Sequence, residues 1–160
     1  MTEVAFHTGL PDKLGYACRL LRKAWRQGAR VMVVGAAQEL ARLDQALWLF
    51  EPEEFVPHLR LRAGAPVPAR LQRTPIWLVD DDVEPALSEA MAEAGVLVNL
   101  GPGDPLQPHR FARVIELVAT DPADLLAARE RWRGYLAEGL SPSNLPYGQS
   151  PGQDQASGAS

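Results

Sequence analysis

The chain has 160 residues, the size of one domain, and a domain of this size can bury roughly 68–70% of the surface that it would expose unfolded. A hydrophobic content of 46% with 22% charged residues excludes a wholly disordered chain. Because 20 acidic residues outweigh 16 basic ones, the net charge is −4, which does not favour sequence-independent binding of nucleic acid.

The first half of the chain alternates short apolar runs with helical patterns. Residues Val4–His7 predict a strand, and a helix is expected to open at Asp12 and to end at Gly28. Its apolar stripe comprises Leu14, Cys18, Leu21 and Trp25. Residues Val31–Val34 predict a strand that is buried on both faces, and Ala37–Trp48 predict a second helix.

The second half continues the alternation after a stretch that Pro and Gly interrupt. The further predicted strands are an edge strand at Leu59–Arg62, then Ile76–Val79, Val96–Leu100 and Val114–Val118. Helices are expected after Asp80–Asp82 and at Ala123–Glu138. This order predicts a single open, mostly parallel α/β sheet with helices on both faces, which is Rossmann-like in general shape.

The last 20 residues differ in composition from the rest. They contain five Ser, three Pro, three Gly and three Gln, and their only charged side chain is Asp154. Such a segment has too little apolar surface to offset the entropy of ordering it. We therefore expect a folded domain at residues 1–140 and a disordered tail at residues 141–160.

No nucleotide motif accompanies the predicted sheet. The turns after the first two strands hold one glycine each, Gly9 and Gly35, whereas a dinucleotide fingerprint needs several so that the backbone can approach the pyrophosphate. The single cysteine, Cys18, excludes an internal disulfide and a Cys-rich zinc site. No run of 18 apolar residues and no signal sequence occurs, so we expect a cytoplasmic protein without a membrane or cofactor.

The residues that could carry catalysis have simpler interpretations. The run Asp80–Asp82 follows a strand, where a metal or nucleotide could bind, but it also suits the capping of a helix N-terminus. The histidines His7, His58 and His109 share no ligand spacing, and no nucleophile motif occurs. A protein without catalytic activity is favoured. The alternative is a small α/β nucleotide-binding domain or enzyme that uses Asp80–Asp82, and a weaker one is DNA binding by the basic face of the first helix.

Two segments have unusual compositions. Aromatic and apolar side chains crowd the end of the second helix and the loop after it, among acidic residues; they are Trp48, Phe50, Phe55 and Val56. Residue types alone fit a core cluster and a protein–protein interface equally well. On the last helix, Arg129 and Arg133 border an apolar stripe that includes Trp132. Spacing favours core packing there, and the alternative is a shallow site for a peptide that ends in an apolar residue with a free carboxylate.

These segments also carry a resemblance to a known family. The patterns are L-D-x-A-L-W at 43–48, F-x-P-x-x-F-V-P-H at 50–58 and A-R-E-R-W-R-G-Y at 128–135. Over residues 1–140 the chain resembles the chi subunit of bacterial DNA polymerase III holoenzyme. The resemblance implies a non-catalytic accessory subunit with a Rossmann-like fold and no cofactor.

The resemblance also implies partners. It implies a heterodimer with the psi subunit of the clamp loader, binding to the acidic C-terminal tail of single-stranded DNA-binding protein, and contact with DNA only through these partners. In some bacteria a repair helicase competes for the psi-binding surface. By position, the psi-binding residues are Trp48, Phe50, Phe55 and Val56. By position, the tail-binding residues are Val118, Arg129, Trp132 and Arg133.

Overall fold

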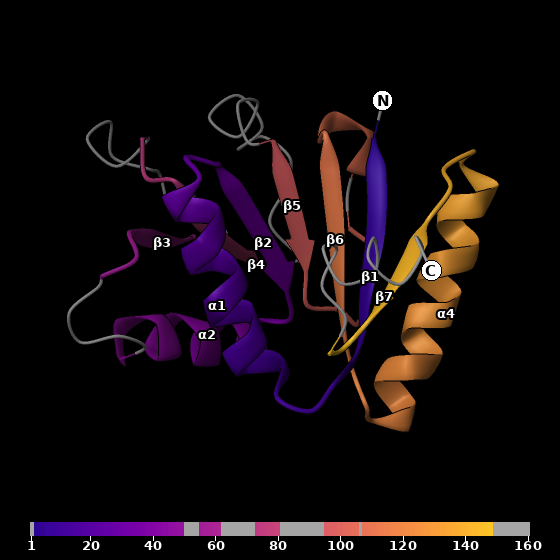
Figure 1. Cartoon of the computed structure of the whole chain (residues 1–160), viewed down its shortest axis with the longest axis horizontal. Coiled ribbons are helices and arrows are strands. Elements are labelled where there is room, and N and C mark those ends of the chain that lie inside the picture. Colours follow the sequence, from indigo (N-terminus) through magenta and orange to yellow (C-terminus); the bar gives the residue numbers. More distant parts are fainter. Residues whose placement is uncertain (1, 50–54, 62–72, 81–94, 106, 149–160) are drawn as a thin grey trace, which may run out of the picture.

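The computed structural model describes residues 2–49, 55–61, 73–80, 95–105 and 107–148. Its strands form one sheet in the order β3-β4-β2-β5-β6-β1-β7, and every described pair of neighbours is parallel (Figure 1). The strands are β1 Glu3–Leu10, β2 Val31–Gly35, β3 His58–Leu61, β4 Ile76–Asp80, β5 Val96–Asn99, β6 Arg113–Ala119 and β7 Ser143–Pro146. The helices are α1 Lys13–Arg26, α2 Ala37–Leu49, α4 Pro122–Ala137 and the short 3₁₀ turn η3 Pro108–Arg110.

Two apolar layers cover the two faces of this sheet. On one face α1 and α2 bury Leu21, Leu40 and Leu43 against strand residues such as Val33 and Leu78. On the other face α4 packs its Ala128 and Tyr135 against Phe6 of β1 and Val114 of β6. The predicted open α/β sheet with helices on both faces is therefore confirmed. The helix expected after Asp80–Asp82 falls in residues 81–94 and lies outside the described residues.

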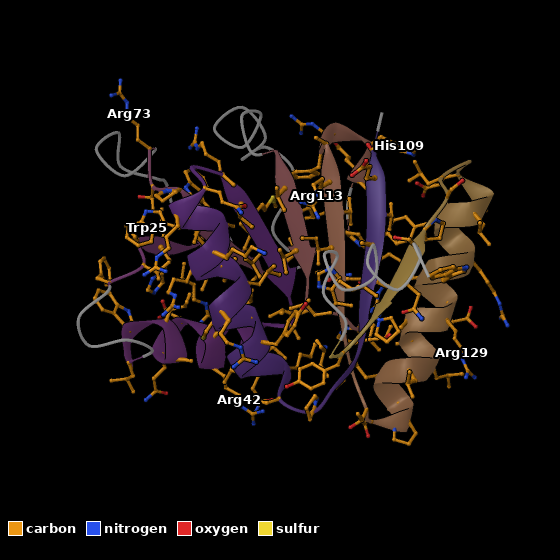
Figure 2. All side chains as sticks on the ribbon, in the orientation of Figure 1. Trp25, Arg42, Arg73, His109, Arg113 and Arg129 are labelled. Carbon is orange, nitrogen blue, oxygen red and sulfur yellow. The ribbon has the colours of Figure 1, made fainter. Side chains whose placement is uncertain are left out.

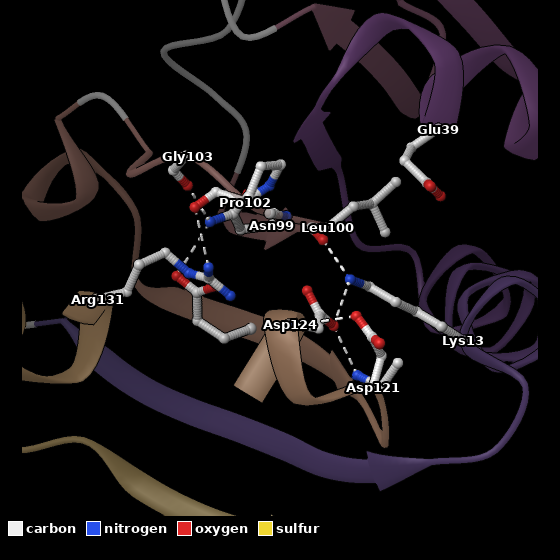
Figure 3. A network of polar contacts seen from close by, with 12 residues as sticks. Lys13, Glu39, Asn99, Leu100, Pro102, Gly103, Asp121, Asp124 and Arg131 are labelled. Carbon is white, nitrogen blue, oxygen red and sulfur yellow. Dashed lines mark hydrogen bonds and ion pairs between the residues drawn. The ribbon is translucent and has the colours of Figure 1, made fainter. Parts of the chain in front are cut away.

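Helix ends follow the local signals in the sequence. Asp12 caps α1 by accepting a hydrogen bond from the Gly15 amide at 3.0 Å, and Gly28 follows the helix at a φ of +77°. At the start of α4, the Asp124 carboxylate accepts from the Ala119 amide at 2.7 Å and pairs with Lys13 at 3.0 Å (Figure 3). These contacts tie the end of β6 to the first turn of α1.

The C-terminal boundary is the main correction to the sequence-based expectation. Residues 141–160 were expected to form a disordered tail, but Ser143–Pro146 form β7, which extends the sheet beside β1. Past β7, the Tyr147 amide donates to the Thr8 carbonyl at 2.8 Å, and the Thr8 hydroxyl donates to Asn144 Oδ1 at 2.7 Å. Composition missed this strand because the backbone pairing with β1, rather than burial of apolar side chains, stabilises it. Residues 149–160 lie outside the described residues.

A buried polar network attaches α4 to the centre of the sheet. Glu116 of β6 is fully buried, and its Oε1 accepts from Arg131 Nε of α4 at 2.9 Å. Its Oε2 accepts from the Tyr135 hydroxyl at 2.6 Å and from Asn99 Nδ2 at 3.2 Å. Arg131 Nη1 also donates to the Pro102 carbonyl at 3.1 Å (Figure 3). The network thus joins α4 to β5 and β6.

Burial dominates the electrostatics of this network. It raises the pKa of the Glu116 carboxyl, and the Arg131 guanidinium with the hydrogen bonds from Tyr135 and Asn99 opposes that rise. Burial also raises the pKa of the Tyr135 hydroxyl above its usual range, and the Glu116 charge adds to the effect. Tyr135 therefore keeps its proton and remains a hydrogen-bond donor to Glu116.

The substitution Arg131→Met tests the network. It leaves the Glu116 carboxylate buried without a counter-ion, so we expect the free energy of unfolding to fall by about 3–5 kcal/mol. Arg129→Met is the matched control, because Arg129 is exposed on the same helix and its loss should change stability by no more than about 0.5 kcal/mol. Urea denaturation measures both, and equal losses in the two variants would contradict a structural role for the buried pair.

A second buried polar contact joins β1 to α1. His7 is buried, and its Nδ1 lies 2.5 Å from the Tyr16 hydroxyl. Burial, with a smaller contribution from the nearby Arg113 guanidinium, lowers the pKa of His7 to about 4. The folded protein therefore holds His7 neutral where an exposed histidine would be protonated.

We expect this histidine to make the fold sensitive to mild acid. Between about pH 6.5 and pH 4 the unfolded chain gains a proton on His7 that the folded chain does not, so the free energy of unfolding falls as the pH falls. The loss attributable to His7 should reach about 3 kcal/mol below pH 4. Urea denaturation between pH 7 and 4 measures it, with His7→Gln as the comparison. If both proteins lose stability equally over this range, His7 does not carry the effect.

Candidate protein-binding surfaces

The first candidate surface is an exposed aromatic cluster where α2 ends and β3 begins. Trp48 is 60% exposed and Phe55 is 49% exposed, yet their rings pack on each other with centroids 4.9 Å apart. The His58 ring lies 5.3 Å from Trp48 and 5.9 Å from Phe55. We call Trp48, Phe55 and His58 the aromatic corner. Exposed rings that support one another in this way are typical of binding hot spots.

A buried contact fixes the orientation of the aromatic corner. The His58 side chain is almost fully buried, with its Nε2 3.0 Å from Asp44 Oδ1 and its Nδ1 donating to the Val56 carbonyl at 2.7 Å. Asp44 belongs to the L-D-x-A-L-W pattern and His58 to the F-V-P-H pattern. The contact links the two sequence patterns, because Asp44 of the first pattern holds the His58 ring of the second beside Trp48 and Phe55. Sequence reasoning quoted both patterns but gave neither Asp44 nor His58 a role.

One of the residues expected at this surface, Val56, is not part of it. Val56 is 0% exposed and belongs to the core beneath α2, so its assignment to a partner-binding surface is wrong in this structure. The Val56 side chain points into the core, whereas the ring of its neighbour Phe55 is about half exposed. Phe50 lies outside the described residues. Leu49, which is exposed beside Trp48, is an apolar residue that the sequence interpretation did not include.

The second candidate surface is the exposed side of α4. Arg129 and Arg133 are both exposed there, and Figure 2 shows Arg129 on the side of the helix that faces away from the strands. Trp132 is half-buried, with its ring 5.0 Å from the Phe6 ring. Arg133 Nη1 donates to Glu130 Oε1 at 3.1 Å, an exposed contact of the kind that contributes little to stability. We call Arg129, Trp132 and Arg133 the α4 outer face.

Val118 does not join the α4 outer face. It is 0% exposed on β6 and packs in the core between the sheet and α4, so its assignment to a surface site is also wrong in this structure. Alternation along the strand explains this outcome, because a central strand covered on both faces exposes neither set of side chains. The α4 outer face thus offers two guanidinium groups and the edge of one indole ring.

Asp80 and Gly35, the described strand-end residues that a nucleotide or enzyme site would use, have structural partners. Asp80, at the end of β4, pairs with Arg60 of β3 at 3.4 Å. Gly35 packs so closely on the residue that follows β5 that a Cβ there would lie 3.0 Å from the Leu100 Cβ. Asp81 and Asp82 lie outside the described residues. In the described part of the chain no group of three or more His, Cys, Asp or Glu side chains could hold a metal ion, and no helix there is long and apolar enough to cross a membrane.

The fold is an open α/β domain with two exposed candidate surfaces for protein binding. Comparison with known proteins then gives its family. The sequence model of the DNA polymerase III chi subunit, HolC, matches residues 1–143, and the chain belongs to this family. It is therefore a replication protein of the DNA polymerase III chi class.

Relatives in sequence support this family, and similar solved structures support the fold. The chain is 33% identical to the DNA polymerase III subunit chi of Pseudomonas aeruginosa, over 91% of this chain and 99% of that protein. It is 29% identical to the corresponding subunit of Haemophilus influenzae, over 81% of this chain and 85% of that protein. The C-terminal domain of S. cerevisiae Dbp5 superposes with a TM-score of 0.62 at 9% identity, covering 99% of this chain and 96% of that chain. That likeness shows the fold alone.

Proposed function

We propose that this chain is a non-catalytic adaptor in the cytoplasm that links the psi subunit of the clamp loader to the C-terminal tail of single-stranded DNA-binding protein. The observation that carries the proposal is the separation of the two surfaces. The aromatic corner lies at the β3 end of the sheet, whereas α4 packs over β6 and β1 toward the other end (Figure 1). Two partners can therefore bind at once without contacting each other.

The aromatic corner supports a long-lived contact with psi. Trp48, Leu49 and Phe55 are three of the large apolar side chains that the described structure leaves exposed, and they are neighbours. Burying such side chains in an interface contributes about 25 cal/mol per Å² of apolar area. The His58–Asp44 contact holds the rings in place before binding, so less conformational entropy is lost when a partner docks. A repair helicase that competes with psi would use the same residues.

The α4 outer face supports a weaker, exchangeable contact with the tail. The Arg129 and Arg133 guanidinium groups can each grip a carboxylate through two parallel hydrogen bonds, and Trp132 offers an apolar edge to a terminal phenylalanine ring. A site this small should bind in the micromolar range, about −8 kcal/mol. Many tails on one coated DNA strand then supply avidity.

Substitution at the aromatic corner should abolish psi binding and leave the fold intact. Because both rings are about half exposed or more, Trp48→Ala with Phe55→Ala should lower stability little while weakening psi binding by at least about 100-fold. Co-purification with psi and calorimetry measure the binding. Leu126→Ala is the control, since Leu126 is equally exposed but lies on α4. Full psi binding by the double variant would remove this surface from the proposal.

Substitution on the α4 outer face should act on the tail alone. A labelled acidic peptide ending in Asp-Ile-Pro-Phe should lose about 10- to 100-fold in affinity on Arg133→Ala, the scale of a hydrogen bond to a charged group. Arg42→Ala is the matched control, because Arg42 is an exposed arginine on α2. Fluorescence anisotropy measures the affinities. Equal binding by wild type and Arg133→Ala would mean that the tail docks elsewhere.

A further inference from the structure

The face of the sheet that carries α1 and α2 is only partly covered. No described helix lies over the β1–β7 edge on that face (Figure 1). A cleft of about 760 Å³ opens there, bounded by α1 on one side and by β7 with Tyr147 on the other. We call it the α1 cleft. It lies on the opposite face of the sheet from α4.

The floor of the α1 cleft is a strip across four strands that is mostly apolar, with Val98 and Ile115 almost fully buried at its base and the polar Ser143 at its β7 end. Strand register places Val98 of β5 beside Ile115 of β6, Ile115 beside Ala5 of β1, and Ala5 beside Ser143 of β7. All four residues line the cleft. Leu20 of α1 adds an apolar wall. A strip of this width suits an extended segment, whose alternate side chains point to one side.

The rim of the cleft is positively charged although the protein as a whole is negative. Arg19 and Lys23 of α1 and Arg113 of β6 line it and are exposed, and no acidic residue of the described chain does so. Glu3 is the register neighbour of Arg113 but is not part of the lining. Against a net charge of −4, three cations around an apolar floor give electrostatic complementarity to an acidic ligand.

The position of the cleft argues against a nucleotide. Open α/β sheets bind nucleotides outside the carboxyl ends of their strands. On β2, β5 and β6 this cleft lies toward the opposite ends, because Val31, Val96 and Arg113 of its lining are each the first residue of a strand, and only on β7 does it reach the carboxyl end, at Pro146. Of the aromatic rings that line it, His7 and Tyr16 contact each other with centroids 5.6 Å apart, so the cleft lacks the series of free rings on which proteins that bind single-stranded nucleic acid stack bases. An acidic peptide fits the cleft better than either.

We propose that the α1 cleft binds an extended acidic peptide segment of a partner protein. The apolar side chains of the segment contact the partly buried Ala5, Leu20 and Val96, and its carboxylates reach Arg19, Lys23 and Arg113. The site is separate from the aromatic corner and from the α4 outer face. It would give this subunit a third contact, independent of the function proposed above.

Fluorescein-labelled octapeptide pools test the proposal with the full-length chain. One pool alternates Asp or Glu with Val or Leu, a second replaces the acids with Lys, and a third replaces them with Ser. The acidic pool alone should bind, and Lys23→Gln with Arg113→Gln should weaken it about tenfold. The matched control is Arg42→Gln with Arg73→Gln, which changes the charge equally at exposed positions away from Arg113 (Figure 2).

Four results would overturn the proposal. The first is that no pool binds or that the Lys23/Arg113 variant binds the acidic pool as well as wild type does. The second is loss of binding on Arg129→Gln with Arg133→Gln instead, which would place the peptide on the α4 outer face and support the function proposed above. The third is that oligo-dT binds more tightly than the acidic pool and that the two compete for the same site. The fourth is binding only after removal of residues 149–160, which would make the chain's own C-terminal segment the occupant.

Discussion

The pairing of Glu116 with Arg131 is the interaction on which the rest of the molecule depends. Glu116 is a charged residue in the middle of a strand that is covered on both faces, and such a charge is stable only with a partner and further hydrogen bonds. Arg131, Tyr135 and Asn99 supply them, so the network sets where α4 crosses the sheet. With Arg131 directed inward, Arg129 and Arg133 of the same helix are directed outward.

A similar relation between a buried contact and an exposed surface occurs at the other end of the sheet. The His58–Asp44 contact lies beneath the exposed rings of Trp48 and Phe55 and joins α2 to the start of β3. In both places a polar contact of low exposure orients side chains that a partner can reach. Rigid support of this kind lowers the entropy lost on binding. This arrangement supports the adaptor function proposed above.

Sequence reasoning predicted the sheet more accurately than it predicted the sites. The described α-helices α1, α2 and α4 begin and end within a few residues of their expected bounds, because caps and apolar periodicity are local signals, whereas the 3₁₀ turn η3 was not expected. It also selected the exposed residues Trp48, Phe55, Arg129 and Arg133 through the resemblance. It misplaced Val56 and Val118, which are buried, because neighbours in a sequence pattern can point to opposite sides of a strand or loop. The charged residue Glu116 inside the apolar run at 114–118 is the sequence feature that could have predicted the buried network.

The sequence by itself determined the fold class, the family and the absence of a nucleotide fingerprint, since these depend on periodicity, glycine spacing and extended motifs. Only the tertiary structure decided which side chains are exposed, that Ser143–Pro146 form a seventh strand, and that α1 leaves a cationic cleft over part of the sheet. The reason is that these features arise from tertiary contacts between separate elements, some of them more than 100 positions apart, such as the register of β7 on β1. Local patterns carry no information about such contacts, because the backbone pairing that forms them is nearly independent of side-chain type.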